Sequence, residues 1–412
     1  MADYIRWAKR VVENALKVRR IVFISGERQC GKTTLTKQVR PAGAIWRTLD
    51  DSKLLKLALQ DPAFFVQHDR GTMVIDEIQK APLLIGEMKQ AVDQDNRKGQ
   101  FLITGSAGVY DSPLVKESLA GRVKNVRLHT LTEGEIRGIK PHFLAKAFAR
   151  EFPGQITGYD KQSILELALR GGFPEVIKLN HTARREWHQE YVQTILDHDL
   201  RSLPDVHIRR ASALKALLEA LAAWSSKYMS LSGICTSLEI SKPTVLDYIS
   251  LLERLYLIER IPAWIKDDYE RVKKTDKVYM ADPGLMASLL RWHFDDIALD
   301  ADRYGKLMET MVAKELAVLV GLDAQYSLYQ YRDRQDHEID FLVENEEQEI
   351  LGIEVKGGSH VSRDDCKHMR WFKDKLPAAK KFTGIVLYTG EDTLSFGDGM
   401  FALPMAALWT DF

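Results

Sequence analysis

An eight-residue stretch near the N-terminus constrains the fold of this 412-residue chain more than any other feature. Residues 26–33 read Gly-Glu-Arg-Gln-Cys-Gly-Lys-Thr and match the pattern G-x-x-x-x-G-K-[ST]. The apolar run 21–24 precedes this stretch, and a helical pattern follows it from Lys32. A glycine loop between a strand and a helix points backbone N–H groups at phosphate oxygens. The stretch therefore predicts a phosphate-binding loop in an α/β domain; the alternative is a glycine-rich turn that binds nothing.

The loop supplies most of the candidate nucleotide-binding residues. We expect Lys32 to contact the β- and γ-phosphates of ATP and Thr33 to bind Mg²⁺ through its hydroxyl. The candidate nucleotide-binding residues, two of them from a later strand end, are Gly26, Glu27, Arg28, Gln29, Cys30, Gly31, Lys32, Thr33, Thr34, Thr104 and Ser106.

Two carboxylates, Asp76 and Glu77, follow the apolar run 73–75. Downstream of a phosphate loop, Asp76 is suited to hold Mg²⁺ through water, and Glu77 is suited to polarise the attacking water. An Asp-Glu pair alone is more often a solvated strand end, so the upstream loop is what favours catalysis. We therefore predict Mg²⁺-dependent ATP hydrolysis with Lys32 and Glu77 as catalytic residues.

Two further segments could complete this site. The apolar run 101–103 ends in Thr104 and Ser106, whose hydroxyls could sense the γ-phosphate or the attacking water; the alternative is a plain β-turn. Arg122 lies among small residues and could serve a neighbouring domain, or a second copy of the chain in a homo-oligomer, as an arginine finger. The alternative for Arg122 is a surface salt bridge.

The pattern of apolar runs divides the chain into three predicted domains. Up to about residue 131, β-rich runs alternate with helical stretches, which indicates a parallel sheet. The pattern weakens after residue 131, and helical periodicity extends from about residue 160 to 285. After that, a helix at 307–320 and strands at 327–331, 339–343, 350–355 and 385–388 are expected. We predict an α/β ATPase domain at 1–155, a helical region at 156–285 and a second α/β domain at 286–412.

The helical region contains a helix-turn-helix pattern at 231–248, with Ser241 as the expected N-cap, followed by a strand at 255–260 suited to a wing. This spacing predicts a winged helix. Residues 201–260 hold eight Lys and Arg against six Asp and Glu, which is a small excess for a DNA reader. The alternative is a packing module between domains. The candidate DNA contacts are Lys242, Thr244, Arg271, Lys273, Lys274 and Lys277.

Carboxylates and a lysine form a second pattern in the last third of the chain. Asp340 begins one apolar strand, and Glu354 and Lys356 share one face of the next because side chains alternate along a strand. Asp340 and Glu354 can bind a divalent metal, Glu309 can reach the site from a helix, and Lys356 can orient the attacking water. The pattern resembles the PD-(D/E)XK nuclease core, which implies a nuclease-like fold and metal-dependent DNA cleavage. The alternative is an exposed hairpin with incidental charges.

Several segments together resemble the prokaryotic AAA-type ATPases that carry a C-terminal domain of unknown function. The resemblance rests on residues 26–33, 76–82, 102–106, 119–122 and 171–175, and on a less similar segment at 197–200. It implies ATP binding and hydrolysis. At positions 198 and 199 the family has an Arg-Asp pair, whereas this chain has His198 and Asp199, so no role is carried over to His198.

Composition excludes several classes of protein. The 58 Lys and Arg balance the 58 Asp and Glu, which excludes a polycation that coats nucleic acid. No apolar run reaches the length of a membrane span. Three widely spaced cysteines favour a reducing compartment, so a cytoplasmic protein is expected. We predict an ATPase that couples its nucleotide state to a winged-helix and nuclease-like module acting on DNA. The alternative is an ATP-switched regulatory binding protein with an inactive nuclease-like domain.

Overall fold

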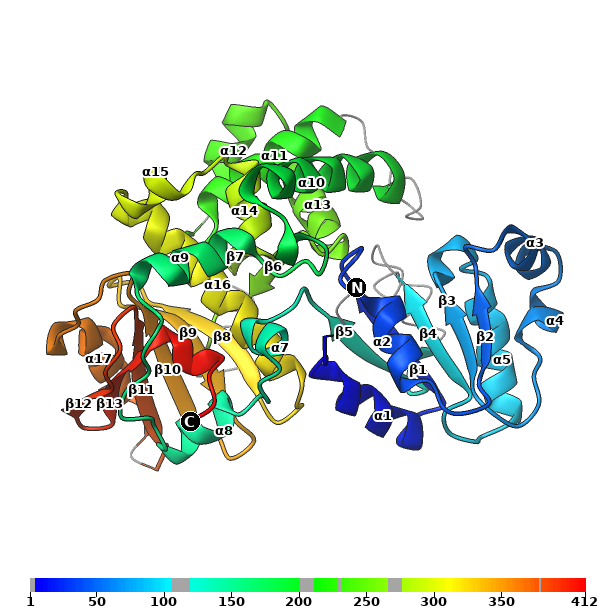
Figure 1. The fold of residues 1–412 in the computed structure, drawn as a ribbon, viewed down its shortest axis with the longest axis horizontal. Coiled ribbons are helices and arrows are strands. Elements are labelled where there is room, and N and C mark those ends of the chain that lie inside the picture. Colours follow the sequence, from blue (N-terminus) through cyan, green and yellow to red (C-terminus); the bar gives the residue numbers. More distant parts are fainter. Residues whose placement is uncertain (1–3, 106–118, 201–210, 229–230, 266–275, 378) are drawn as a thin grey trace.

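A five-stranded parallel sheet carries the N-terminal third of the chain, in the order β2-β3-β4-β1-β5 (Figure 1). The computed structural model describes residues 4–105, 119–200, 211–228, 231–265, 276–377 and 379–412. The strands are β1 (Ile21–Gly26), β2 (Ile45–Thr48), β3 (Met73–Asp76), β4 (Phe101–Gly105) and β5 (Val123–Leu128). The predicted strands at 21–24, 73–75, 101–103 and 126–128 are thus confirmed, whereas β2 was not predicted.

Alternating side chains along the strands build one core on each face of this sheet. Val22 and Ile24 point to the face that α1 and α2 cover, whereas Ile21 and Phe23 point to the face that α3, α4 and α5 cover. The helices are α1 (Ala8–Val18), α2 (Lys32–Val39), α3 (Ser52–Gln60), α4 (Pro62–Val66) and α5 (Leu84–Gln94). Because all five strands are parallel, their carboxyl ends lie together, next to the glycine loop that follows β1.

Helices α7 (Glu133–Arg137) and α8 (Phe143–Ala149) follow β5. In the part of the middle region that the structure describes, helices accompany one short antiparallel hairpin. The elements there are α9 (Lys161–Arg170), α10 (His181–Thr194), α11 (Ala211–Trp224), α12 (Leu231–Leu238), α13 (Lys242–Arg254), β6 (Ile258–Ile261), β7 (Lys277–Met280), α14 (Pro283–Leu289) and α15 (Phe294–Ala298). Ser241 caps α13 by accepting a hydrogen bond from the N–H of Thr244 (3.3 Å), as predicted. The winged-helix assignment and the domain boundaries at 155 and 285 stay predictions.

A six-stranded sheet in the order β12-β13-β11-β10-β9-β8 forms the C-terminal part. The long helix α16 packs on one face, whereas α17 packs on the other, where Met369 and Phe372 meet Leu342 and Val386. The elements are α16 (Ala301–Gly321), β8 (Ser327–Arg332), β9 (Glu338–Glu344), β10 (Ile350–Val355), α17 (Lys367–Lys375), β11 (Phe382–Tyr388), β12 (Leu394–Gly397) and β13 (Met400–Pro404). Strands β12 and β13 were not predicted; the other four were.

A buried carboxylate, Asp282, joins the segment after β5 to the middle region. Its Oδ2 atom accepts hydrogen bonds from the hydroxyl of Thr130 (2.9 Å) and the N–H of Gly172 (2.8 Å). Its Oδ1 atom caps α14 by accepting from the N–H groups of Gly284 (2.9 Å) and Leu285 (3.1 Å). Asp282 therefore fixes the segment after β5 and the segment after α9 against the start of α14.

Helices that could cross a membrane are absent from the part of the chain that the structure describes, because none is both long and apolar enough.

Candidate active site

The glycine loop connects β1 to α2 and closely approaches the end of β5. Gly26 has φ of +147°, and an added Cβ atom would lie 2.0 Å from the carbonyl oxygen of Leu128. Gly31 has φ of +102° and precedes the first helical residue, Lys32. The first turn of α2 contains no acidic side chain. The backbone therefore presents the N–H groups of a helix N-terminus next to a glycine turn, which fits a phosphate group.

Three polar side chains meet beside this loop at the carboxyl ends of the strands. The Thr33 hydroxyl donates to Asp76, with both carboxylate oxygens at 3.1 Å. The Thr104 hydroxyl, at the end of β4, donates to the same carboxylate. Lys32 Nζ donates to the carbonyl oxygens of Gly26 (3.1 Å) and Glu27 (2.6 Å). The structure thus places Lys32 and Thr33, at the start of α2, beside Asp76 and Thr104, at the ends of β3 and β4.

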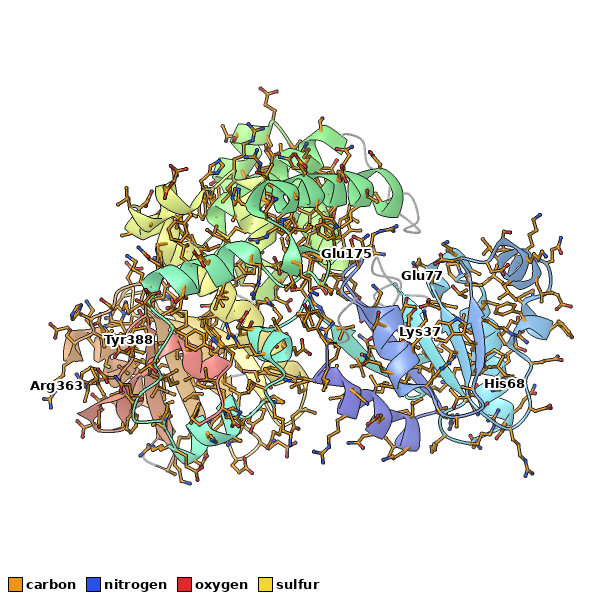
Figure 2. The ribbon with its side chains drawn as sticks, viewed as in Figure 1. Lys37, His68, Glu77, Glu175, Arg363 and Tyr388 are labelled. Atoms are coloured by element: carbon orange, nitrogen blue, oxygen red, sulfur yellow. The ribbon has the colours of Figure 1, made fainter. Side chains whose placement is uncertain are left out.

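Glu77 occupies an unusual backbone conformation beside this group. Its φ of +63° is left-handed, which is uncommon for a residue other than glycine and often occurs at functional sites. Its N–H donates to the Thr104 hydroxyl (3.1 Å), and its carboxylate accepts from the amide of Gln79. Burial raises the pKa of Glu77, the Lys32 ammonium lowers it and the Asp76 carboxylate raises it. Figure 2 shows Glu77 at the upper end of the N-terminal sheet.

A chain of buried and partly buried charged groups leads from the loop to the middle region. Glu27 lies within the loop and is 1% exposed, and burial raises its pKa to about 7. Its Oε1 atom lies 3.9 Å from Nη2 of Arg127, on β5, and 3.7 Å from Nδ1 of His129. Arg127 in turn donates to Glu259, on β6, at 2.9 Å, and its guanidinium stacks 4.9 Å from the ring centre of Tyr256. One arginine therefore contacts both the nucleotide loop and the β6–β7 hairpin.

Arg6 holds the loop from the other side. Its guanidinium donates to the carbonyl oxygens of Cys30 (2.6 Å) and His129 (2.6 Å), and it forms an ion pair with Glu135 (3.1 Å). Arg6 is 5% exposed, so these contacts lie away from solvent. Arg6, Arg127 and Glu259 were not predicted, because each acts through a partner far away in the sequence.

The other residues predicted to contact the nucleotide differ in their exposure to solvent. Gln29 and Thr34 lie in the loop and the first turn of α2, and both are exposed. Cys30 is buried, and its Sγ atom donates to the Leu128 carbonyl oxygen (3.2 Å). Arg28 lies in the loop, partly exposed. Ser106 lies outside the described residues.

Arg122 lies near the amino-terminal ends of the parallel strands, whereas the glycine loop lies at their carboxyl ends. Its carbonyl oxygen accepts a hydrogen bond from the N–H of Ile21, the first residue of β1. The glycine loop begins at the other end of that strand. Its guanidinium forms an ion pair with Asp93 (2.6 Å) and donates to the Ala120 carbonyl oxygen (3.0 Å). A finger role across an interface between two copies stays a prediction, and within its own domain Arg122 serves as a surface salt bridge.

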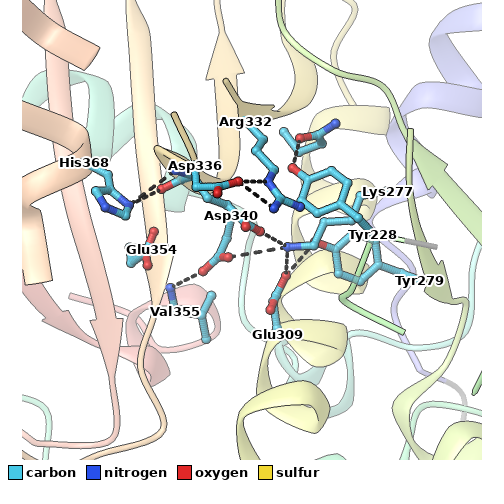
Figure 3. Close-up of polar contacts among 12 residues, drawn as sticks. Tyr228, Lys277, Tyr279, Glu309, Arg332, Asp336, Asp340, Glu354, Val355 and His368 are labelled. Carbon is cyan, nitrogen blue, oxygen red and sulfur yellow. Dashed lines mark hydrogen bonds and ion pairs between the residues drawn. The ribbon is translucent and has the colours of Figure 1, made fainter. Parts of the chain in front are cut away.

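The C-terminal carboxylates gather between α16, β9 and β10 (Figure 3). Asp340 Oδ2 accepts from the N–H of Val355 (2.8 Å), and Lys356 forms an ion pair with Glu354 (3.0 Å). Burial and then the Asp340 charge raise the pKa of Glu309 to about 7 and that of Glu354 to about 8. The Asp340 carboxylate is therefore close enough to disfavour ionisation of Glu309 and of Glu354.

The prediction that Lys277 contacts DNA is wrong. Lys277 is 1% exposed, because β7 packs against the C-terminal part and carries its ammonium among carboxylates. Lys277 Nζ lies 2.7 Å from Glu309, 2.8 Å from Glu338 and 3.6 Å from Asp340. Lys242 is exposed at the start of α13 and Thr244 is partly exposed there, and Arg271, Lys273 and Lys274 lie outside the described residues.

Within the described ranges, no group of three or more His, Cys, Asp and Glu side chains is arranged to hold a metal ion. Metal binding by the pair Asp340 and Glu354 stays a prediction.

Three family models match successive parts of the chain. Residues 18–137 match an AAA domain, residues 161–296 a domain of unknown function (DUF8612), and residues 304–408 another domain of unknown function (DUF4143). The first match and the parallel sheet with its glycine loop together identify the N-terminal part as an AAA-type P-loop domain.

Similar proteins span nearly the whole chain. Uncharacterized protein Rv2008c of Mycobacterium tuberculosis is 28% identical over 409 residues, covering 97% of this chain and 83% of that protein. Uncharacterized protein MJ1637 of Methanocaldococcus jannaschii is 24% identical over 396 residues, covering 88% of this chain and 80% of that protein. Among solved structures, the RuvB Holliday junction branch migration motor of Thermotoga maritima is 17% identical, with a TM-score of 0.27, over 65% of this chain and 94% of RuvB. At that TM-score the similarity to RuvB adds nothing to the domain match.

Proposed function

We propose that this protein binds ATP with Mg²⁺, hydrolyses it, and passes its nucleotide state to the middle region and the C-terminal domain. The observation that carries the proposal is the meeting of Thr33, Asp76 and Thr104 beside the Lys32 loop. The AAA domain match over residues 18–137 supports the same conclusion.

Each side chain in the site has a role that follows from its position. The N–H groups of the loop and Lys32 would hold the phosphates, and Thr33 and Asp76 would hold Mg²⁺, which neutralises phosphate charge when bound. The Thr104 hydroxyl orients the Asp76 carboxylate by donating a hydrogen bond to it, and it accepts a hydrogen bond from the N–H of Glu77. Glu77 would accept the proton of the attacking water, and its raised pKa strengthens it as a base.

Transmission of the nucleotide state is proposed to pass through Arg127. Glu27 lies in the loop, and its oxygens accept no hydrogen bond from the residues that the structure describes. A change in loop conformation would therefore move a buried charge that faces Arg127, and Arg127 would pass the change to Glu259 on β6. DNA remains the proposed partner of α13, where Lys242 is exposed.

An ATP-switched regulatory protein with an inactive C-terminal domain is the second candidate. The ion pairs of Lys277 with the carboxylates favour it, because the ammonium already provides a positive charge for the cluster.

Lys32→Ala tests nucleotide binding. We expect ATP affinity, measured by equilibrium dialysis with Mg²⁺, to fall by about 10- to 100-fold, since a hydrogen bond to a charged group contributes roughly 1.5–3 kcal/mol. Lys37→Ala is the matched control, because Lys37 is exposed on the same helix and lies 5.7 Å from the Trp46 ring centre. Equal affinities for the two variants would reject the loop as the ATP site.

Arg127→Gln tests transmission. In the unaltered protein, ATP with Mg²⁺ should change the hydrogen–deuterium exchange of strand β6, and in Arg127→Gln that change should vanish while ATP still binds. Lys124→Gln, an exposed change on the same strand, should behave like the unaltered protein. An ATP response in β6 that survives Arg127→Gln would show that the coupling takes another route.

A further inference from the structure

Strand β7 places two side chains, Lys277 and Tyr279, on a cluster of C-terminal carboxylates. Figure 3 shows Glu309, Asp340 and Glu354 of this cluster, and Glu338 belongs to it through its ion pair with Lys277. Lys277 Nζ contacts Glu309, Glu338 and Asp340. The hydroxyl of Tyr279 donates to Glu309 Oε1 at 2.7 Å, the same oxygen that accepts from Lys277. Both donors come from the middle region, whereas all the carboxylates belong to the C-terminal part.

These contacts do not fit a divalent metal at the same place. A metal that bound Glu309 Oε1 and Asp340 Oδ1 would compete for these oxygens with Lys277, and with Tyr279 for Glu309 Oε1. Its double positive charge would also lie within a few ångströms of a buried ammonium, where like charges repel strongly. A metal and Lys277 therefore compete for the cluster.

Access is not what would keep an ion out. A cavity of about 520 Å³ borders Lys277, Glu309 and Glu338, so small ions can approach the cluster. The four carboxylates of the cluster are paired with only two ammonium groups, those of Lys277 and Lys356. Removing Lys277 would therefore leave an excess of negative charge in the cluster, which attracts a cation.

We propose that Lys277 is a built-in cation that excludes divalent metal ions from the C-terminal carboxylate cluster and so keeps this domain in an inhibited arrangement. Lys277 holds the ligands from outside their own domain, so a movement of β7 would expose them. Strand β7 pairs with β6, where Glu259 contacts Arg127. Control of that movement by nucleotide rests on the proposed function; the competition between Lys277 and metal does not.

Mn²⁺ titration of the full-length chain in the absence of nucleotide tests the proposal. We expect Lys277→Met to bind Mn²⁺ about tenfold or more tightly than the unaltered protein, because a repelling charge is removed and carboxylates are left unpaired. Adding Asp340→Asn to Lys277→Met should abolish the gain. Lys306→Met is the matched control, since Lys306 borders the same cavity but pairs with Asp302, and it should leave Mn²⁺ affinity unchanged.

Two results would overturn the proposal. One is a gain of Mn²⁺ binding in Lys277→Met that survives Asp340→Asn, because the ion would then bind elsewhere. The other needs no change at Lys277 and so stands even if Lys277→Met fails to fold: Mn²⁺ raises the unfolding temperature of the unaltered protein, and Asp340→Asn removes that rise. In that case the cluster already accepts metal with Lys277 in place. No shift with Mn²⁺ in the unaltered protein is the expected result.

Discussion

Glu77→Gln is expected to slow ATP hydrolysis by about 10²–10⁴-fold, the usual contribution of a general base. Glutamine keeps the size of the side chain and leaves Lys32, Thr33 and Asp76 in place, so ATP should still bind. The effect should therefore appear in kcat with little change in affinity. Single-turnover hydrolysis and ATP binding, measured on the same preparation, separate the two quantities.

The pH dependence offers an independent check on the same residue. A base works only when ionised, and burial raises the pKa of Glu77 above its ordinary value of 4.5. Turnover should therefore fall as the pH drops through this raised pKa, and that decline should be absent from the residual activity of Glu77→Gln. Glu13→Gln, a change on the surface of α1, should leave both rate and pH profile unchanged. Wild-type turnover in Glu77→Gln would rule out this residue as the base.

Elements with strong local patterns were predictable from the sequence. Buried runs such as 21–24 and 101–103 are apolar throughout, as expected for parallel strands covered on both faces. Strand β2 (Ile45–Thr48) has only four residues, none of them buried, and Ile45 is 40% exposed, so it lacks an apolar run. Strand β12 (Leu394–Gly397) is an edge strand with the same lack of burial.

Candidate site residues with a local sequence pattern were likewise predictable, whereas those placed only by long-range packing were not. Lys32 and Thr33 belong to a contiguous motif, and Asp76 follows a strand whose neighbours in the sheet could be inferred. Lys277 had only its charge and a place among basic residues as a signal, which favoured an exposed DNA contact. Its burial depends on where β7 packs, and a contact between residues 277 and 340 across two regions leaves no local pattern in a single sequence.

Asp282→Ala is expected to destabilise the fold by roughly 3–5 kcal/mol, since each buried donor left without a partner costs about 1–3 kcal/mol. Asp282 is fully buried and accepts from Thr130, Gly172, Gly284 and Leu285. Alanine removes all of these acceptors and also the N-cap of α14. Unfolding by urea, followed by circular dichroism and tryptophan fluorescence, measures the loss.

Asp300→Ala separates this effect from ordinary helix capping. Asp300 caps α16 by accepting from the N–H groups of Asp302 and Arg303, but its side chain is 39% exposed, so water can replace it. We expect Asp300→Ala to cost only about 0.5–2 kcal/mol, the usual range for an N-cap. If Asp282→Ala cost no more than Asp300→Ala, Asp282 would be a simple cap. A larger loss, with the two spectroscopic transitions no longer coinciding, would mean that this carboxylate holds the AAA-type domain and the middle region together.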